Sequence, residues 1–128
     1  MNRLNIITCA LLGILLFSCE DKEYYKGEYI IINDSNEAID CYAVGRNISA
    51  PSVEIHDYIS ANSMLSLRKV DITDKAKVED IFVSIEIYQN GQKATKNPMN
   101  QELWIKTDSN NQLTYTLTVD STFFRWNP

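Results

Sequence analysis

Apolar and polar residues alternate along most of the chain after residue 27, and a period of two predicts β-strands. Turn formers separate these segments, among them Asn33-Asp34-Ser35-Asn36 and the Asn90-Gly91 pair that is typical of a tight hairpin. Residues 80–89 give the clearest pattern, with two expected faces: Ile81, Val83, Ile85 and Ile87 against Phe82, Ser84, Glu86 and Tyr88. About seven such segments predict an all-β fold, an antiparallel immunoglobulin-like β-sandwich.

Other strands add detail to this picture. In residues 38–44, Cys41 shares one face with Ile39 and Ala43, and the other face carries Asp40, Tyr42 and Val44. An unpaired cysteine in such a strand is expected to be buried like a small hydrophobe. Residues 52–59 alternate more weakly, which favours an edge strand. In residues 112–119 the leucines, Tyr115 and Val119 are expected inside and the threonines outside. Helix signals are weak, and residues 73–80 predict one or two turns.

The first 18 residues have the parts of an export signal, with Arg3 supplying charge ahead of an apolar stretch. That stretch is shorter than the roughly 20 apolar residues of a spanning helix. Leu16-Phe17-Ser18 before Cys19 resembles the lipobox of bacterial lipoproteins, and the resemblance implies that Cys19 becomes the lipidated first residue. Lipid on Cys19 would then attach the protein to a membrane.

The residues after Cys19 are acidic. Glu20, Asp21 and Glu23 resemble the export signal that directs lipoproteins of Bacteroidetes to the cell surface, although an ordinary solvated linker has the same composition. The expected organisation is therefore a removed signal peptide (1–18), a lipidated cysteine with an acidic tether (19–26) and one β-sandwich domain (27–128).

Several segments together resemble a family. The lipobox, the strand that ends in Asn33-Asp34-Ser35, the segment EDIFVSIEIY (79–88) and the final LTYTLTVDSTFFRW (113–126) resemble the small uncharacterised β-sandwich lipoproteins of Bacteroides and its relatives. The resemblance implies attachment to the outer membrane. In addition, Asp120-Ser121-Thr122 resembles the O-glycosylation motif of Bacteroidetes, which makes Ser121 a candidate acceptor.

Charge narrows the choice of partners. Residues 19–128 carry 11 basic and 17 acidic side chains, a net charge of −6. Binding to nucleic acid requires a basic face, and so does direct contact of the domain with anionic lipid. We therefore expect neither kind of partner for the domain.

Candidate catalytic chemistry is sparse, and we expect neither an enzyme nor a cofactor. The single histidine, His56, is followed by Asp57, and neighbours on a strand point to opposite faces, which disfavours a Ser-His-Asp arrangement. One histidine and one cysteine in the domain are too few for a zinc site. Two alternatives stay open: a calcium loop formed by Asp34, Asn36 and Asp40, and a carboxylate-dependent hydrolase that uses Glu54, Glu86 and Glu102.

Aromatic residues favour a binding role instead. Exposed rings suit sugars or a protein partner, although most rings in a small domain belong to its core. The candidates for exposure are Tyr24, Tyr25, Tyr42, Tyr58, Tyr88 and Trp104. The sequence therefore predicts a lipid-anchored, non-catalytic binding or accessory module at the outer membrane, on the cell surface if the acidic signal acts. The alternative binding role is a periplasm-facing inhibitor or immunity-type partner.

Overall fold

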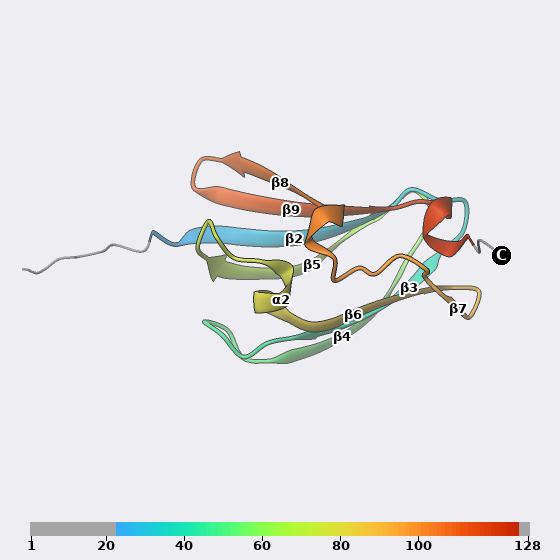
Figure 1. Cartoon of the computed structure of the whole chain (residues 1–128), viewed down its shortest axis with the longest axis horizontal. Helices are drawn as coiled ribbons and strands as arrows, with labels where there is room; N and C mark the ends of the chain where they lie inside the picture. The colour runs from blue at the N-terminus through green and yellow to red at the C-terminus, as the bar shows by residue number, and fades with distance from the viewer. Residues whose placement is uncertain (1–22, 126–128) are drawn as a thin grey trace, which may run out of the picture.

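The computed structural model describes residues 23–125, which form two four-stranded sheets packed face to face (Figure 1). The first sheet has the strand order β5 (Met64–Ile72), β2 (Tyr25–Asn33), β9 (Gln112–Val119), β8 (Trp104–Ser109). The second has the order β4 (Val53–Ile59), β3 (Ile39–Gly45), β6 (Phe82–Gln89), β7 (Gln92–Lys93). Three short helices complete the fold: α2 (Val78–Ile81), η2 (Gln101–Leu103) and η3 (Ser121–Phe124). The predicted all-β sandwich is confirmed.

One strand pair departs from the expected antiparallel arrangement. Among residues 23–125, the first strand, β2, runs parallel to the last, β9, whereas every other pair is antiparallel. The strand order also differs from the ABED and CFG sheets of constant-type antibody domains, so the likeness to immunoglobulin domains lies in the architecture. In addition, β2 already begins at Tyr25, inside the segment 19–26 that the sequence assigns to the tether.

Two β-bulges change which side chains face the core. Between β3 and β6, Val44 pairs with Ser84 and Gly45 with Phe82, so Val83 is an extra residue on β6. Phe82 is consequently fully buried and Val83 is 52% exposed, the reverse of the expected faces. The prediction for these two residues was wrong because strict alternation cannot continue through a bulge.

The second bulge lies on β5, where Tyr29 pairs with Arg68 and Ile30 with Ser66. Leu67 is the extra residue, and both Leu67 and Arg68 are buried. The Arg68 guanidinium reaches the residues that flank β6, β3 and β4 of the second sheet and donates hydrogen bonds to the carbonyls of Ile81 (2.7 Å), Arg46 (2.8 Å) and Pro51 (3.1 Å). Burial lowers the pKa of this guanidinium. A buried arginine therefore fastens the two sheets together at one end.

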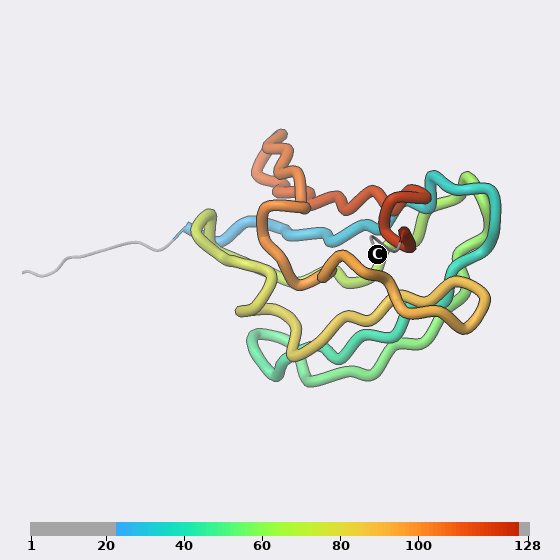
Figure 2. Tube along the Cα trace, turned by 45° about the vertical axis from the view of Figure 1, so that its right-hand side comes forward, coloured from blue at the N-terminus to red at the C-terminus, as the bar shows by residue number. Residues whose placement is uncertain are grey.

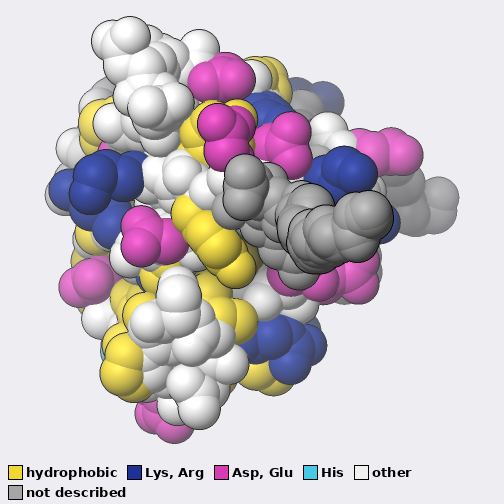
Figure 3. Space-filling view, turned by 90° about the vertical axis from the view of Figure 1, so that its left-hand side faces the viewer, with side chains coloured by type: hydrophobic (Ala, Val, Ile, Leu, Met, Phe, Trp, Pro, Cys, Tyr) yellow, Lys and Arg dark blue, Asp and Glu magenta, His cyan; other side chains and the backbone are white. Residues whose placement is uncertain are grey.

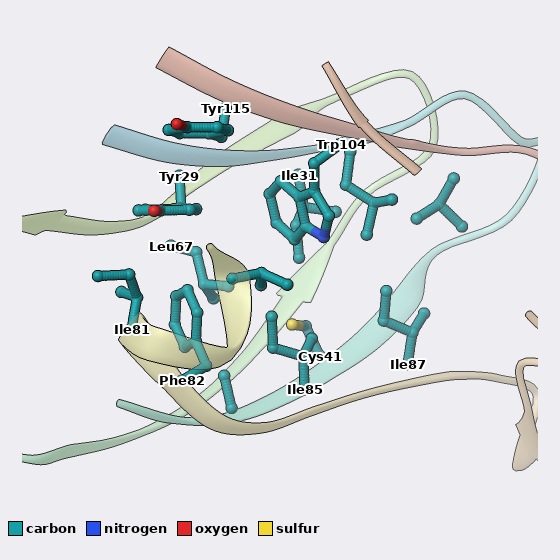
Figure 4. Close-up of a cluster of buried hydrophobic side chains, with 14 of the residues drawn as sticks. Tyr29, Ile31, Cys41, Leu67, Ile81, Phe82, Ile85, Ile87, Trp104 and Tyr115 are labelled. Carbon is teal, nitrogen blue, oxygen red and sulfur yellow. The ribbon is translucent and has the colours of Figure 1, made fainter. Parts of the chain in front are cut away.

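An aromatic cluster fills the centre of the core (Figure 4). The Tyr29 ring stacks on Tyr115 at a centroid distance of 5.0 Å and meets Phe82 and Trp104 edge-on at 5.5 and 5.8 Å. Trp104 is 6% exposed and its indole nitrogen donates to the Pro98 carbonyl at 2.7 Å. The sequence had placed Trp104 among the candidates for exposure, and this is wrong because its indole has a buried acceptor that lets the whole side chain enter the core.

The turn after β2 is organised by Asn33, whose side chain is fully buried. Its amide nitrogen donates to the carbonyls of Glu37 (2.8 Å), Ile59 (2.9 Å) and Ser60 (3.2 Å). Its amide oxygen accepts from the backbone and the hydroxyl of Ser35. Asn33, the last residue of β2 in the first sheet, thereby ties the β2–β3 connection to the end of β4 in the second sheet.

The two ends of the sandwich differ in what they carry. The start of β2 and the β3–β4 hairpin lie at one end, and the β6–β7 hairpin and η3 lie at the other (Figure 1). After β7 the chain crosses from the second sheet to the first through residues 94–103, which are drawn in orange along the side of the sandwich (Figure 2).

Candidate functional site

The outer face of the second sheet gathers aromatic and acidic side chains from three neighbouring strands. Cross-strand pairing places Asp40 between Tyr58 and Tyr88, and in the next row places Tyr42 between His56 and Glu86. Side chains in one cross-strand row lie about 4.5–5.5 Å apart at Cβ. We call this surface the tyrosine face, and it comprises Asp40, Tyr42, His56, Tyr58, Glu86 and Tyr88. Each of its carboxylates has a tyrosine next to it on a neighbouring strand.

The rings of the tyrosine face contact one another. Tyr42 stacks on the His56 imidazole with centroids 4.0 Å apart and an interplanar angle of 12°. Tyr88 meets Tyr42 edge-on, with centroids 5.7 Å apart and an angle of 87°. One side of Tyr42 is therefore covered by the histidine, and the Tyr88 ring stands nearly perpendicular to it.

Each carboxylate of the face already contacts a basic side chain. An Asp40 oxygen lies 3.1 Å from His56 Nε2, and a Glu86 oxygen lies 3.7 Å from Lys93 Nζ. The Tyr88 hydroxyl donates to the other Glu86 oxygen at 3.1 Å, and this hydrogen bond is the main cause that raises the pKa of Tyr88. Tyr88 is therefore a neutral phenol at physiological pH.

Between these groups lies a pocket of about 290 Å³. It is lined by Asp40, Tyr42, Glu86, Tyr88 and Gly91, so the turn of the β6–β7 hairpin forms one of its sides. Tyr42 is 41% exposed and Tyr58, beside Asp40, is 72% exposed. The pocket thus opens on a surface that already presents aromatic area to solvent.

The outer face of the first sheet is different in kind. Its paired positions carry threonines at 107, 114, 116 and 118 together with aliphatic and charged side chains, and none of those positions in β2, β5, β8 and β9 carries an aromatic ring. Ile105 is its most exposed large hydrophobic residue, at 68%. The cluster of exposed tyrosines is therefore specific to the outer face of the second sheet.

Of the six aromatic candidates, the structure brings Tyr42, Tyr58 and Tyr88 together on this face. Tyr24 is exposed near the tether, Tyr25 is half-buried, and Trp104 is in the core. Sequence reasoning missed Asp40, Glu86 and Lys93 as partners of the tyrosines. Alternation already placed Asp40 with Tyr42 and Glu86 with Tyr88, but the pairing of β3 between β4 and β6 was needed to join them.

The carboxylates of the hydrolase alternative do not share one face. Glu54 and Glu86 both lie on the outer face of the second sheet, on strands that β3 separates, and strands two apart are about 9.5 Å from each other. Glu102 lies in η2, outside the paired strands.

The residues considered for nucleophilic chemistry are also kept apart. His56 pairs across from Tyr42 on the outer face, whereas Asp57 pairs across from Cys41 and belongs to the opposite face of β4. Cys41 is fully buried beside Ile85 and Ile87 (Figure 4), and burial raises the pKa of its thiol to about 12. The expected buried structural cysteine is confirmed.

The residues of the calcium alternative serve other contacts. Asp40 contacts His56 on the tyrosine face, while Asp34 and Asn36 are exposed in the turn that Asn33 organises. Within residues 23–125, no group of three or more His, Cys, Asp or Glu side chains is arranged to hold a metal ion.

The residues expected to direct and modify the protein lie near its ends. Cys19, Glu20 and Asp21 fall outside the described residues, and Glu23 is exposed and accepts a hydrogen bond from the Tyr25 hydroxyl at 3.2 Å. Ser121 is exposed at the start of η3, and the preceding Asp120 caps that helix through the Thr122 amide at 2.9 Å. The described part of the chain contains no helix long and apolar enough to cross a membrane.

The end of the sandwich nearest the tether carries both signs of charge. Figure 3 views this end and shows acidic and basic side chains interspersed around a smaller apolar area. Such a mixed surface is unlike the clustered lysines and arginines that bind anionic lipid.

Fold and site together define an all-β, two-layer sandwich with an aromatic and acidic outer face. Comparison with protein-family models, with curated proteins and with solved structures gave no match for this chain.

Proposed function

We propose that this protein is a lipid-anchored, non-catalytic binding module of the bacterial outer membrane, and that it binds its ligand on the tyrosine face. The observation that carries the proposal is the gathering of Tyr42, Tyr58 and Tyr88 on one outer face of the sandwich. Tyrosine gives a large contact area at a low cost in conformational entropy, and its hydroxyl still forms hydrogen bonds, so exposed tyrosines are enriched at binding surfaces.

The position of the face supports this role. β2 begins at one end of the sandwich, and the Asn90–Gly91 turn beside the pocket lies at the opposite end (Figure 1). A lipid on Cys19 would therefore hold the pocket away from the membrane, where a ligand can approach it. Cys41, the free thiol among the described residues, is buried in the core and does not lie beside the His56–Asp40 pair, which supports binding rather than catalysis.

Two measurements test the proposal. The first is protease shaving of intact cells that express the wild type, Cys19→Ala, or a variant in which Glu20, Asp21 and Glu23 are neutralised. Digestion of the wild type with protection of the neutralised variant supports surface display. A wild-type protein that is digested only after the cells are broken would instead favour the periplasm-facing partner role.

The second measurement locates the binding face. The chain from residue 19, with Cys19→Ser, is applied to a glycan array and to a peptide array, alongside Tyr42→Ser and Tyr58→Ser. The matched control is Ile105→Ser, which removes a side chain of similar exposure (68% against 72% for Tyr58) from the other sheet. We expect ligands whose binding falls in both tyrosine variants and persists in the control. Ligands that bind all of the variants equally would refute the tyrosine face as the site.

A further inference from the structure

The pocket beside the β6–β7 hairpin combines two kinds of wall. Tyr42 and Tyr88 supply aromatic rings, and Asp40 and Glu86 supply carboxylates. The ring faces carry partial negative charge, and the carboxylates carry full negative charge. All four groups therefore favour a positively charged ligand.

A sugar ring fits this arrangement poorly. The two tyrosine rings stand at 87° to each other, and the His56 imidazole already covers one side of Tyr42. The two tyrosine rings therefore do not form a common platform on which a sugar ring could stack. A cation has no such requirement, because it is attracted to a ring face within about 6 Å of the centroid and to any carboxylate oxygen.

The carboxylates are at present shared with the protein's own basic groups. His56 and Lys93 contact Asp40 and Glu86, and their side chains are 54% and 60% exposed. An exposed ion pair such as Lys93–Glu86 contributes about 0–1 kcal/mol, and the His56–Asp40 contact is a single hydrogen bond, so a better-placed cation can displace both at little cost.

None of the residues that line the pocket carries a basic side chain. Lys93 and His56 are the basic groups that contact its carboxylates, and the remaining titratable groups of the tyrosine face are Asp40, Glu86 and the three tyrosines. Glu54 lies on the same side of the sheet but outside the tyrosine face and the pocket. The net charge of −6 on residues 19–128 adds long-range attraction for a basic partner.

We propose that this pocket receives an arginine side chain of a partner protein. The inference rests on the proposed binding role of the tyrosine face and names the chemical group that the face recognises. Arginine is favoured over lysine because its planar guanidinium stacks on an aromatic ring while its five donors reach carboxylates on both sides. Here those carboxylates come from the neighbouring strands β3 and β6.

The test uses the peptide acetyl-Gly-Gly-Arg-Gly-Gly-amide as the probe and its citrulline counterpart as the control, since citrulline has nearly the same shape without the charge. Each is titrated into the isotope-labelled chain from residue 19 with Cys19→Ser, which contains both complete sheets, and backbone amide shifts are followed by NMR. We expect saturable shifts centred on Tyr42, Glu86, Tyr88 and Gly91 with the arginine peptide only. Raising the salt from about 0.05 to about 0.5 M should weaken them.

Variants separate the pocket from general attraction to an acidic protein. Asp40→Asn and Glu86→Gln should each weaken arginine binding by about three- to tenfold, as expected for one charge-assisted contact at a partly exposed site. Glu54→Gln removes the same charge from the same outer face but does not touch the pocket, and should leave binding unchanged.

The outcomes distinguish this inference from the broader proposal. Equal binding of the arginine and citrulline peptides, or equal weakening by Glu54→Gln and Glu86→Gln, would overturn the arginine pocket. An oligosaccharide that shifts the same amides while the arginine peptide does not would also overturn it, and would leave the tyrosine face standing as a binding site. Array ligands that bind regardless of Tyr42 and Tyr58 would overturn the face itself.

Discussion

Asn33→Asp should turn the stability of this domain into a steep function of pH. The substitution keeps the size of the side chain but replaces an amide nitrogen that lies 2.8, 2.9 and 3.2 Å from three carbonyl oxygens. A carboxylate in that position would face three acceptors and have no proton to donate. Because the side chain is fully buried, the folded state should accept only the protonated acid, so the pKa of the introduced carboxyl should be raised.

The size of the effect follows from the contacts. The protonated acid donates one hydrogen bond where the amide donated two, which costs about 1–2 kcal/mol. Keeping the acid protonated costs about 1.4 kcal/mol for each pH unit above its unfolded pKa of about 3.9, or about 4 kcal/mol at pH 7 and about 1.5 kcal/mol at pH 5. The total penalty is then about 5–6 kcal/mol at pH 7 and about 3 kcal/mol at pH 5, against an expected total stability of about 5–15 kcal/mol.

The assay is urea unfolding at pH 5, 6 and 7, followed by tryptophan fluorescence, since Trp104 is buried in the folded state. The sign is fixed by linkage: a raised folded pKa means that the penalty grows as pH rises from about 4 towards that pKa. Asn36→Asp is the matched control, because Asn36 is exposed in the same turn and should change stability by less than about 0.5 kcal/mol. A penalty for Asn33→Asp that is the same at pH 5 and pH 7 would refute the reasoning.

Three further predictions concern the core and its fastening. Arg68→Met should lower the free energy of unfolding by about 2 kcal/mol and Tm by roughly 10 °C. The reason is that the Arg46 and Pro51 carbonyls lose their hydrogen-bond donor, whereas the Ile81 carbonyl still accepts from the Arg46 amide. An unchanged melting curve would contradict this. Gly45→Ala would place a Cβ 2.6 Å from Arg68 Nη1, so it should destabilise the wild type by about 1–3 kcal/mol and the Arg68→Met variant by less. If urea unfolding shows that the double variant loses the sum of the two single losses, the contact between these residues is not supported. Cys41, with its pKa raised to about 12, should resist Ellman's reagent at pH 8 in the folded chain from residue 19 with Cys19→Ser and react fully in urea; stoichiometric labelling of the folded protein would show the burial to be wrong.

The strands were predictable from the sequence because their signals are local. Alternation placed Leu113, Tyr115 and Leu117 inside, and Asn90-Gly91 marked the β6–β7 turn, where Gly91 has a φ of +76°. The weak alternation of residues 52–59 correctly predicted β4 as an edge strand. Each of these features depends on residues a few positions apart, so tertiary contacts were not needed to find them.

What escaped prediction depends on pairing between distant strands. A bulge is defined by the partner strand, so neither the reversal of Phe82 and Val83 nor the burial of Arg68 could be read from one strand alone. The parallel pairing of β2 with β9 joins the two ends of the domain and leaves no local signal. The tyrosine face was predicted in part, since alternation assigned Asp40 and Tyr42 to one side of their strand. The residues of β4 and β6 that lie beside them became known only from the strand register.

The parallel pairing of the first and last strands also has a mechanical consequence. Because β2 and β9 run in the same direction, the chain enters the first sheet at one end and leaves it at the other. A pull between the two termini therefore acts along β2, which is hydrogen-bonded on both sides, to β5 and to β9. The hydrogen bonds of a sheet lie across its strands, so such a force loads many of them together in shear instead of opening them one at a time. A domain held by its N-terminal tether and pulled from its far end would thus resist force in its strongest direction.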